Sequence, residues 1–251
     1  MIERHPKDPG FDIGPDAFVH VPQLKGRIRD PHLSKFRFLD FEEIDRRAKQ
    51  AGYPENWRRP DDEREASRRK ALEAQPDEDV WIFAYGSLMW DPGFYFDEVR
   101  IGRLAGYERR FCLHLTGGRG SPETPGFMAA LDFGDLCDGV AFRIGAEKVE
   151  HETAVIWRRE MIAYGYVPTN VAVSTAQGEI SAITFVADHG SERYAGPVGI
   201  DEAAQKIARA EGMMGSNIEY VLNLDEQLEL LGLEDAHFSE LAARTRAYGG
   251  R

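Results

Sequence analysis

The sequence has 251 residues, with 31 basic and 43 acidic side chains and a net charge of −12. A surface that binds nucleic acid needs a basic face, so this charge argues against a nucleic-acid partner and favours small-molecule chemistry. No apolar stretch approaches membrane-spanning length, and the first residues lack the apolar core of a signal peptide. We therefore expect a cytoplasmic protein without a membrane partner, and the sequence leaves its oligomeric state open.

Residues 1–78 are predicted to be a polar extension, partly helical, that packs on a main domain formed by residues 79–251. Up to about residue 40 the chain is rich in Pro, Gly and Asp, which is typical of an extended arm. Short helices are expected at 41–52 and 61–74. The second is almost entirely charged, and we interpret it as a solvated helix face without function. Because the chemistry described below lies after residue 80, the extension is expected to be dispensable for catalysis.

The main domain combines short strands with fewer helices. Strands are expected at 81–85, 100–104, 109–116, 127–132, 139–144, 166–176 and 179–187, and helices at 147–165, 201–212, 216–232 and 234–248. Many short strands with one inserted helix indicate an α+β fold, a small mixed β-barrel with surrounding helices. Ser216 and Glu219 fit a capping box at the start of a helix, which gives Glu219 a structural interpretation rather than a catalytic one.

The first stretch with chemical potential is VWIFAYGSLMW at residues 80–90. Its first half is an unbroken apolar run, as expected of a buried strand. Gly86 and Ser87 interrupt the run and permit a tight turn with backbone N–H groups facing outward, where an anion can bind. A core strand followed by an ordinary turn is an equally good interpretation of these residues alone.

The second stretch is the helix expected at 147–165. Its apolar residues form one stripe at helical spacing: Val149, Ile156, Trp157 and Tyr164. Glu160 shares that face, and burial would raise its pKa toward the range in which a carboxylate serves as a general base. The alternative is an edge glutamate paired with an arginine such as Arg109 or Arg143. The other charged residues, Glu150, Glu152, Arg158 and Arg159, are expected to be exposed.

Other kinds of site find little support. The seven histidines form no ligand pair and the glycine loops lack a Walker lysine, so neither a metal nor a cofactor is expected. Gly-x-Ser-x-Gly is absent, and Ser87 is therefore interpreted as a binding residue rather than a nucleophile. Cys112 and Cys137 lie in apolar segments and are expected to be reduced core thiols.

Residues 83–90, FAYGSLMW, resemble the signature loop of the ChaC-like γ-glutamylcyclotransferases. Further blocks follow in the same order as in that family: GYERRF at 106–111, CDGVAF at 137–142, RE at 159–160 leading to YGY at 164–166, YAGP at 194–197 and SNIEY at 216–220. The resemblance covers roughly residues 80–245. It implies a compact barrel with helices packed around it and a single cavity.

The resemblance also implies a reaction. A γ-glutamyl substrate, glutathione in the first place, would close onto its own α-amino group to give 5-oxoproline and the released Cys-Gly. Glu160 would be the catalytic acid and base. The substrate-binding residues would be Tyr85, Gly86, Ser87, Leu88, Tyr166 and Tyr194, with the loop amides on the α-carboxylate and the tyrosines orienting the substrate.

Two departures from the family leave the substrate open. The N-terminal extension has no counterpart in the family pattern, and the sequence of the glycine loop at 117–126 differs from that of the family. The same chemistry would serve γ-glutamyl amino acids or γ-glutamylamines. Two alternatives belong to other classes. One is a non-catalytic regulator that binds a γ-glutamyl ligand or a protein partner, against which the presence of Glu160 argues. The other is a nucleotide-binding role, which rests only on the glycine loops.

Overall fold

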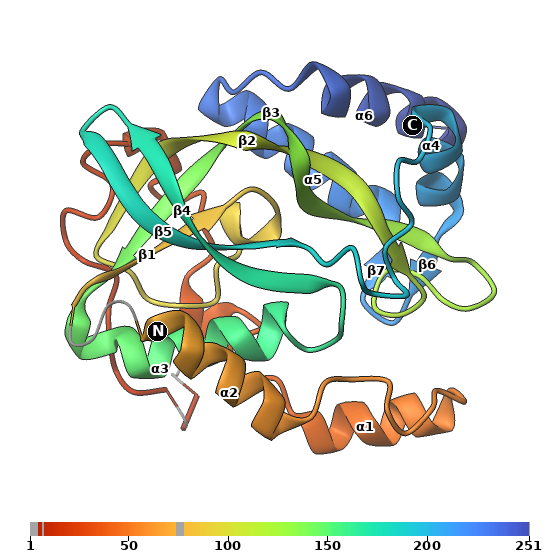
Figure 1. Ribbon diagram of the computed structural model, residues 1–251, viewed down its shortest axis with the longest axis horizontal. Coiled ribbons are helices and arrows are strands. Elements are labelled where there is room, and N and C mark those ends of the chain that lie inside the picture. Colours follow the sequence, from red (N-terminus) through yellow and green to blue (C-terminus); the bar gives the residue numbers. More distant parts are fainter. Residues whose placement is uncertain (1–4, 7, 74–77, 251) are drawn as a thin grey trace.

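A computed structural model describes residues 5–6, 8–73 and 78–250. Its centre is a closed five-stranded barrel (Figure 1). The strands are β1 Val80–Ala84, β2 Glu98–Leu115, β3 Gly126–Ile144, β4 Tyr166–Thr175 and β5 Gly178–Ala187. They follow the order β1-β3-β2-β4-β5, and a parallel pairing of β1 with β5 closes a barrel whose other neighbours are mainly antiparallel. The predicted α+β fold, a small mixed β-barrel with surrounding helices, is confirmed.

A long hairpin of β2 and β3 replaces four of the predicted short strands. The pairing runs from Glu98 opposite Arg143 to Leu115 opposite Gly126, with register shifts near Ala105 and Phe111. Gly106 lies at the first shift with φ +83°, a conformation that glycine adopts without strain. The polar stretches there bend the hairpin instead of ending its strands.

Helices cover the barrel on two sides (Figure 1). One group consists of α1 Phe41–Gln50, α2 Asp61–Leu72 and α3 Ala146–Glu160, and the other of α4 Ile200–Arg209, α5 Asn217–Leu231 and α6 Ala236–Gly249. Three short 3₁₀ helices, η1 Pro22–Leu24, η2 Pro31–Leu33 and η3 Ser87–Met89, and a small hairpin of β6 Glu211–Gly212 and β7 Gly215–Ser216 complete the elements. Buried rings of Phe94, Phe142, Trp157 and Phe185 fill the main core between the strands and helices.

The helix α3 is shorter than the sequence predicted. It ends at Glu160, and the chain turns before β4 begins at Tyr166. Tyr164 therefore leaves the apolar stripe and is 40% exposed. Two of the charged residues expected to be exposed, Glu152 and Arg159, are buried instead. That expectation was wrong because both have partners in distant segments.

The segment before β1, called the N-terminal arm from here on, packs against the barrel. Ala17, Val21, Leu24 and Ile28 are buried in the same core cluster as the barrel strands. Arg37 reaches the buried carboxylate of Glu152 on α3 with two hydrogen bonds, of 2.7 and 2.9 Å. This ion pair joins the arm to α3, and breaking a buried pair by removing one partner is strongly destabilising.

The interpretation of α2 as a solvated face was wrong on one side of the helix. Arg68 is only 2% exposed and donates to the Glu150 carboxylate and to the Thr153 hydroxyl on α3. A charged sequence thus attaches the helix to its neighbour through guanidinium hydrogen bonds, in addition to the core packing of Ala71 and Leu72.

The capping box is also absent, although α5 begins where predicted. Ser216 is the N-cap, but its side chain makes no capping bond, and its buried hydroxyl oxygen has no partner among the described residues. The Glu219 carboxylate turns to Arg119, 3.2 Å away, and is 52% exposed. Glu219 is therefore a surface ion-pair partner.

The two cysteines are free and buried, as predicted. Burial raises the pKa of Cys112 to about 12 and that of Cys137 to about 11, so both remain unreactive thiols at neutral pH. Within residues 8–73 and 78–250, none of the helices combines the length and apolar character that a membrane crossing requires.

Candidate active site

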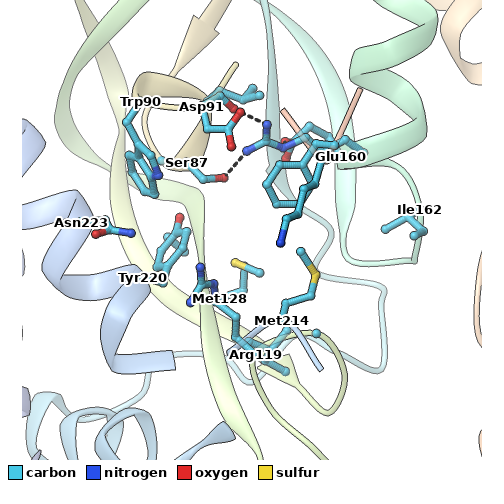
Figure 2. Close-up of a pocket in the computed structure, with 18 of the residues that line it drawn as sticks. Ser87, Trp90, Asp91, Arg119, Met128, Glu160, Ile162, Met214, Tyr220 and Asn223 are labelled. Atoms are coloured by element: carbon cyan, nitrogen blue, oxygen red, sulfur yellow. Dashed lines mark hydrogen bonds and ion pairs between the residues drawn. The ribbon is translucent and has the colours of Figure 1, made fainter. Parts of the chain in front are cut away.

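A cavity of about 1470 Å³ opens at one end of the barrel. Its wall combines the turn after β1, the end of α3, the start of β4, one face of α5, the glycine loop after β2 and part of the N-terminal arm. Figure 2 shows Ser87, Glu160 and Tyr220 around this space. The cavity thus brings together the two stretches that the sequence singled out.

The turn after β1 forms the first part of the site. Tyr85, Gly86, Ser87 and Leu88 all line the cavity, and η3 begins at Ser87. Gly86 has φ −138°, so the backbone does not require glycine; the space does, since a Cβ there would lie 2.6 Å from the Tyr220 hydroxyl oxygen. Tyr220 on α5 therefore lies directly behind the loop.

Glu160 is the second part of the site. It is the last residue of α3, lines the cavity and has a side chain that is 18% exposed. Burial raises the pKa of its carboxyl, and the neighbouring Arg159 guanidinium opposes that rise. The carbonyl end of a helix also disfavours a negative charge. A carboxylate with a raised pKa at the edge of a cavity is suited to accept and return a proton.

The arginine partner of Glu160 is its neighbour in sequence. Arg159 Nε lies 3.0 Å from Glu160 Oε1. Neither arginine suggested by the sequence takes that place. Arg109 donates to the Tyr85 carbonyl at 2.7 Å and pairs with an aspartate of the α5–α6 connection, and Arg143 pairs with acidic groups at the far end of β1 and β2.

Arg159 is a site residue that sequence reasoning missed. Its Nη2 donates to Ser87 Oγ at 2.7 Å and its Nη1 donates to the carbonyl of Asp91, as the dashed lines in Figure 2 show. One side chain therefore connects the carboxylate at the end of α3 with the loop after β1. The only sequence signal was its place beside Glu160 in the Arg-Glu block.

Three tyrosines surround Glu160, and one of them was not predicted. Burial raises the pKa values of Tyr85, Tyr166 and Tyr220, and the charge of Glu160 adds to each rise. All three phenols therefore stay neutral at physiological pH. Tyr220 lies in the SNIEY block, for which the sequence suggested no function; it lines the cavity, and its hydroxyl lies against Gly86.

The hydroxyls of the two predicted tyrosines are already occupied. Tyr85 donates to the Phe185 carbonyl at 2.7 Å, and Tyr166 donates to the Ala129 carbonyl at 2.6 Å. Both rings line the cavity. They are placed to shape its wall, with their hydroxyls bonded to the barrel backbone.

Tyr194 is not brought to the site. It is missing from the described residues that line the cavity. Its hydroxyl donates to Asp132 at 2.8 Å and its ring stacks on His189 with centroids 4.2 Å apart. The acid and the histidine hold the ring on another part of the surface, so the structure gives Tyr194 a packing role.

The N-terminal arm reaches the cavity, which the sequence did not predict. Arg29, Phe36, Tyr53 and Trp57 are part of the wall. The Tyr53 hydroxyl donates to the Thr116 carbonyl at 2.5 Å and so joins the arm to the glycine loop. The arm therefore borders the cavity, and its dispensability for catalysis stays a prediction. In the described part of the chain, no three His, Cys, Asp or Glu side chains gather as a metal site requires.

Comparisons with known proteins identify the family of this chain. A model of the ChaC-like protein family matches residues 80–248. A glutathione-specific γ-glutamylcyclotransferase of Escherichia coli (strain K12) is 40% identical over 182 residues, covering 72% of this chain and 79% of that protein. The Homo sapiens glutathione-specific γ-glutamylcyclotransferase 1 is 33% identical over 175 residues, covering 68% of this chain and 78% of that protein.

A solved structure supports the fold. The crystal structure of a yeast γ-glutamyl cyclotransferase specific to glutathione has a TM-score of 0.63 at 22% identity, and the match covers 68% of this chain and 97% of that chain. The barrel is therefore of the γ-glutamylcyclotransferase type. The chain belongs to the ChaC-like protein family, as its sequence motifs predicted.

Proposed function

We propose that this protein is a γ-glutamylcyclotransferase that cleaves glutathione to 5-oxoproline and Cys-Gly. The observation that supports this most is the meeting of Glu160 with the Tyr85–Leu88 loop in one cavity, joined through Arg159. The Escherichia coli and Homo sapiens relatives are called glutathione-specific γ-glutamylcyclotransferases. Their shared name supports the choice of glutathione over other γ-glutamyl compounds.

The substrate carries its own nucleophile. The α-amino nitrogen attacks the γ-carbonyl carbon, a new C–N bond closes a five-membered ring, and the bond from that carbon to the cysteinyl nitrogen breaks. Glu160 accepts a proton from the attacking amine and returns one to the leaving nitrogen. The cavity must therefore hold the glutamyl chain curled, so that the two reacting atoms meet as in an intramolecular reaction.

The loop supplies the anchor for this curled chain. Backbone amides of Gly86, Ser87 and Leu88 would bind the glutamyl α-carboxylate, as peptide nests bind anions. The Tyr220 hydroxyl lies against Gly86 in the same loop and would add a neutral donor to the same anion. Tyr85 and Tyr166 would form the walls on either side. An α-carboxylate held here would leave the α-amine to face Glu160.

One assay tests the proposal. Purified protein is incubated with glutathione, γ-Glu-Ala or a γ-glutamylamine, and 5-oxoproline is measured from each. Release that is fastest from glutathione supports the proposal, whereas faster release from another substrate changes the leaving group. No release from any of them, with ligand binding retained, would leave the regulator alternative in its place.

A further inference from the structure

The N-terminal arm supplies much of the cavity wall, although the family model begins only at residue 80. Of the 45 residues that line the cavity, 15 lie between Gly26 and Trp57. A third of the pocket is therefore built from a segment outside the family match. The contacts of this segment with the residues around Glu160 indicate whether it contributes to the reaction or only covers the cavity.

The contact that matters most is made by Phe36. The guanidinium carbon of Arg159 lies 4.0 Å from the centre of the Phe36 ring. The same guanidinium reaches Ser87 Oγ at 2.7 Å and Glu160 Oε1 at 3.0 Å. An aromatic ring attracts a cation over its face, and the attraction grows where water is excluded; the Arg159 side chain is only 5% exposed. The ring thus holds the guanidinium where it touches both loop and carboxylate.

Phe36 lies in the chain between two arginines that pair with acidic side chains. The next residue, Arg37, has a side chain that is 1% exposed and is paired with the buried Glu152 of α3. On the other side of Phe36, Arg29 Nε lies 3.3 Å from an oxygen of Asp91, just after η3. The arm is therefore attached both to the helix that carries Glu160 and to the loop that carries Ser87.

We propose that Phe36 is a positioning residue of the reaction, which acts through Arg159 to set the Glu160 carboxylate relative to the Ser87 loop. This inference rests on the proposed function. Proton transfer requires the base within hydrogen-bond reach of the amine, so a displaced carboxylate lowers turnover and not only binding. Loss of the ring is expected to lower kcat.

The arm offers a matched control in Phe18. That residue is also partly buried, and its ring packs on Phe96 with centroids 5.8 Å apart, but it does not line the cavity. Three variants are compared with the native chain: Phe36→Leu keeps apolar bulk without a ring, Phe36→Tyr keeps a ring, and Phe18→Leu removes a ring elsewhere on the arm. For each, kcat and KM for glutathione and the thermal midpoint are measured.

The expected result is that Phe36→Leu lowers kcat about tenfold, the effect of losing one desolvated cation–ring contact. Phe36→Tyr should restore most of that loss. Phe18→Leu should lower the thermal midpoint about as much as Phe36→Leu does, while its kcat stays native.

Three results would overturn the inference: native kcat in Phe36→Leu, equal losses in Phe36→Leu and Phe36→Tyr, or a change confined to KM. If the native chain is active and one of these results is found, only the role of Phe36 is overturned. A native chain that releases no 5-oxoproline overturns the proposed function, and this role with it.

Discussion

Arg159 Nη2 donates to Ser87 Oγ at 2.7 Å, and this bond ties the end of α3 to the loop after β1. The two segments are 72 residues apart in the chain. One carries the carboxylate proposed to move the proton, and the other carries the amides proposed to hold the substrate. A single buried side chain thus bridges the base and the anchor.

Replacing Arg159 with Lys should show that this bond depends on geometry. Lys keeps the positive charge but lacks the planar fork that reaches Ser87, Glu160 and a backbone carbonyl at once. We expect kcat/KM for glutathione to fall by roughly 10- to 100-fold, a loss of the size seen when a charged hydrogen bond is removed. Steady-state kinetics with a thermal melt would check it. A folded Arg159→Lys variant with native kinetics would show that charge alone suffices.

The pH dependence of turnover should report the surroundings of Glu160. Burial raises the pKa of this carboxyl above its usual value of 4.5, and activity needs the deprotonated form. Activity should therefore appear as pH rises through the raised pKa. Arg159 lowers the pKa of Glu160, so Arg159→Gln should move this acid limb to higher pH. The rate is measured from pH 4 to 9 in both proteins; an acid limb that moves to lower pH would contradict the assignment.

Much of this site follows from local pattern. The apolar run before Gly86 and the stripe that includes Glu160 depend on neighbours within a few residues, and both patterns predicted the correct element. The burial of Glu152 depends on Arg37, 115 residues away, and the position of Tyr194 depends on Asp132, 62 residues away. Periodicity carries no signal for such pairs.

The role of the arm was missed for the same reason. Residues 1–40 have no periodic pattern, and their few apolar side chains predicted attachment to the domain without indicating where. Phe36 meets Arg159 where the buried Arg37 and Glu152 hold the two segments together. The packing of this arm against the site is a property of the tertiary structure.

Gly86 should tolerate a methyl group only if Tyr220 makes room. A Cβ at Gly86 would lie 2.6 Å from the Tyr220 hydroxyl oxygen but 3.9 Å from the ring carbon that bears it. Gly86→Ala should therefore destabilise the fold by about 1–3 kcal/mol, as overpacking does. Adding Tyr220→Phe should recover part of that loss. Denaturant unfolding of the two variants and of Tyr220→Phe alone completes the cycle, and additive effects would contradict the close approach.

Tyr194→Phe should separate packing from substrate binding. The change removes one hydrogen bond, to Asp132, at a site outside the described cavity lining. We expect a loss of about 1 kcal/mol in stability with native KM for glutathione. Tyr166→Phe is the comparison, since Tyr166 does line the cavity. A large rise in KM for Tyr194→Phe would return Tyr194 to the substrate site.

The most direct test of the account is 5-oxoproline release by Glu160→Gln. Gln keeps the shape of Glu but cannot take the amine's proton, so kcat should fall by about 10²- to 10⁴-fold or more, the contribution of a general base. Binding of glutathione to the folded variant should persist. Glu219→Gln is the control, because Glu219 is half exposed, pairs with Arg119 and is absent from the described residues that line the cavity; it should retain native turnover. Near-native turnover in folded Glu160→Gln would contradict the proposed mechanism.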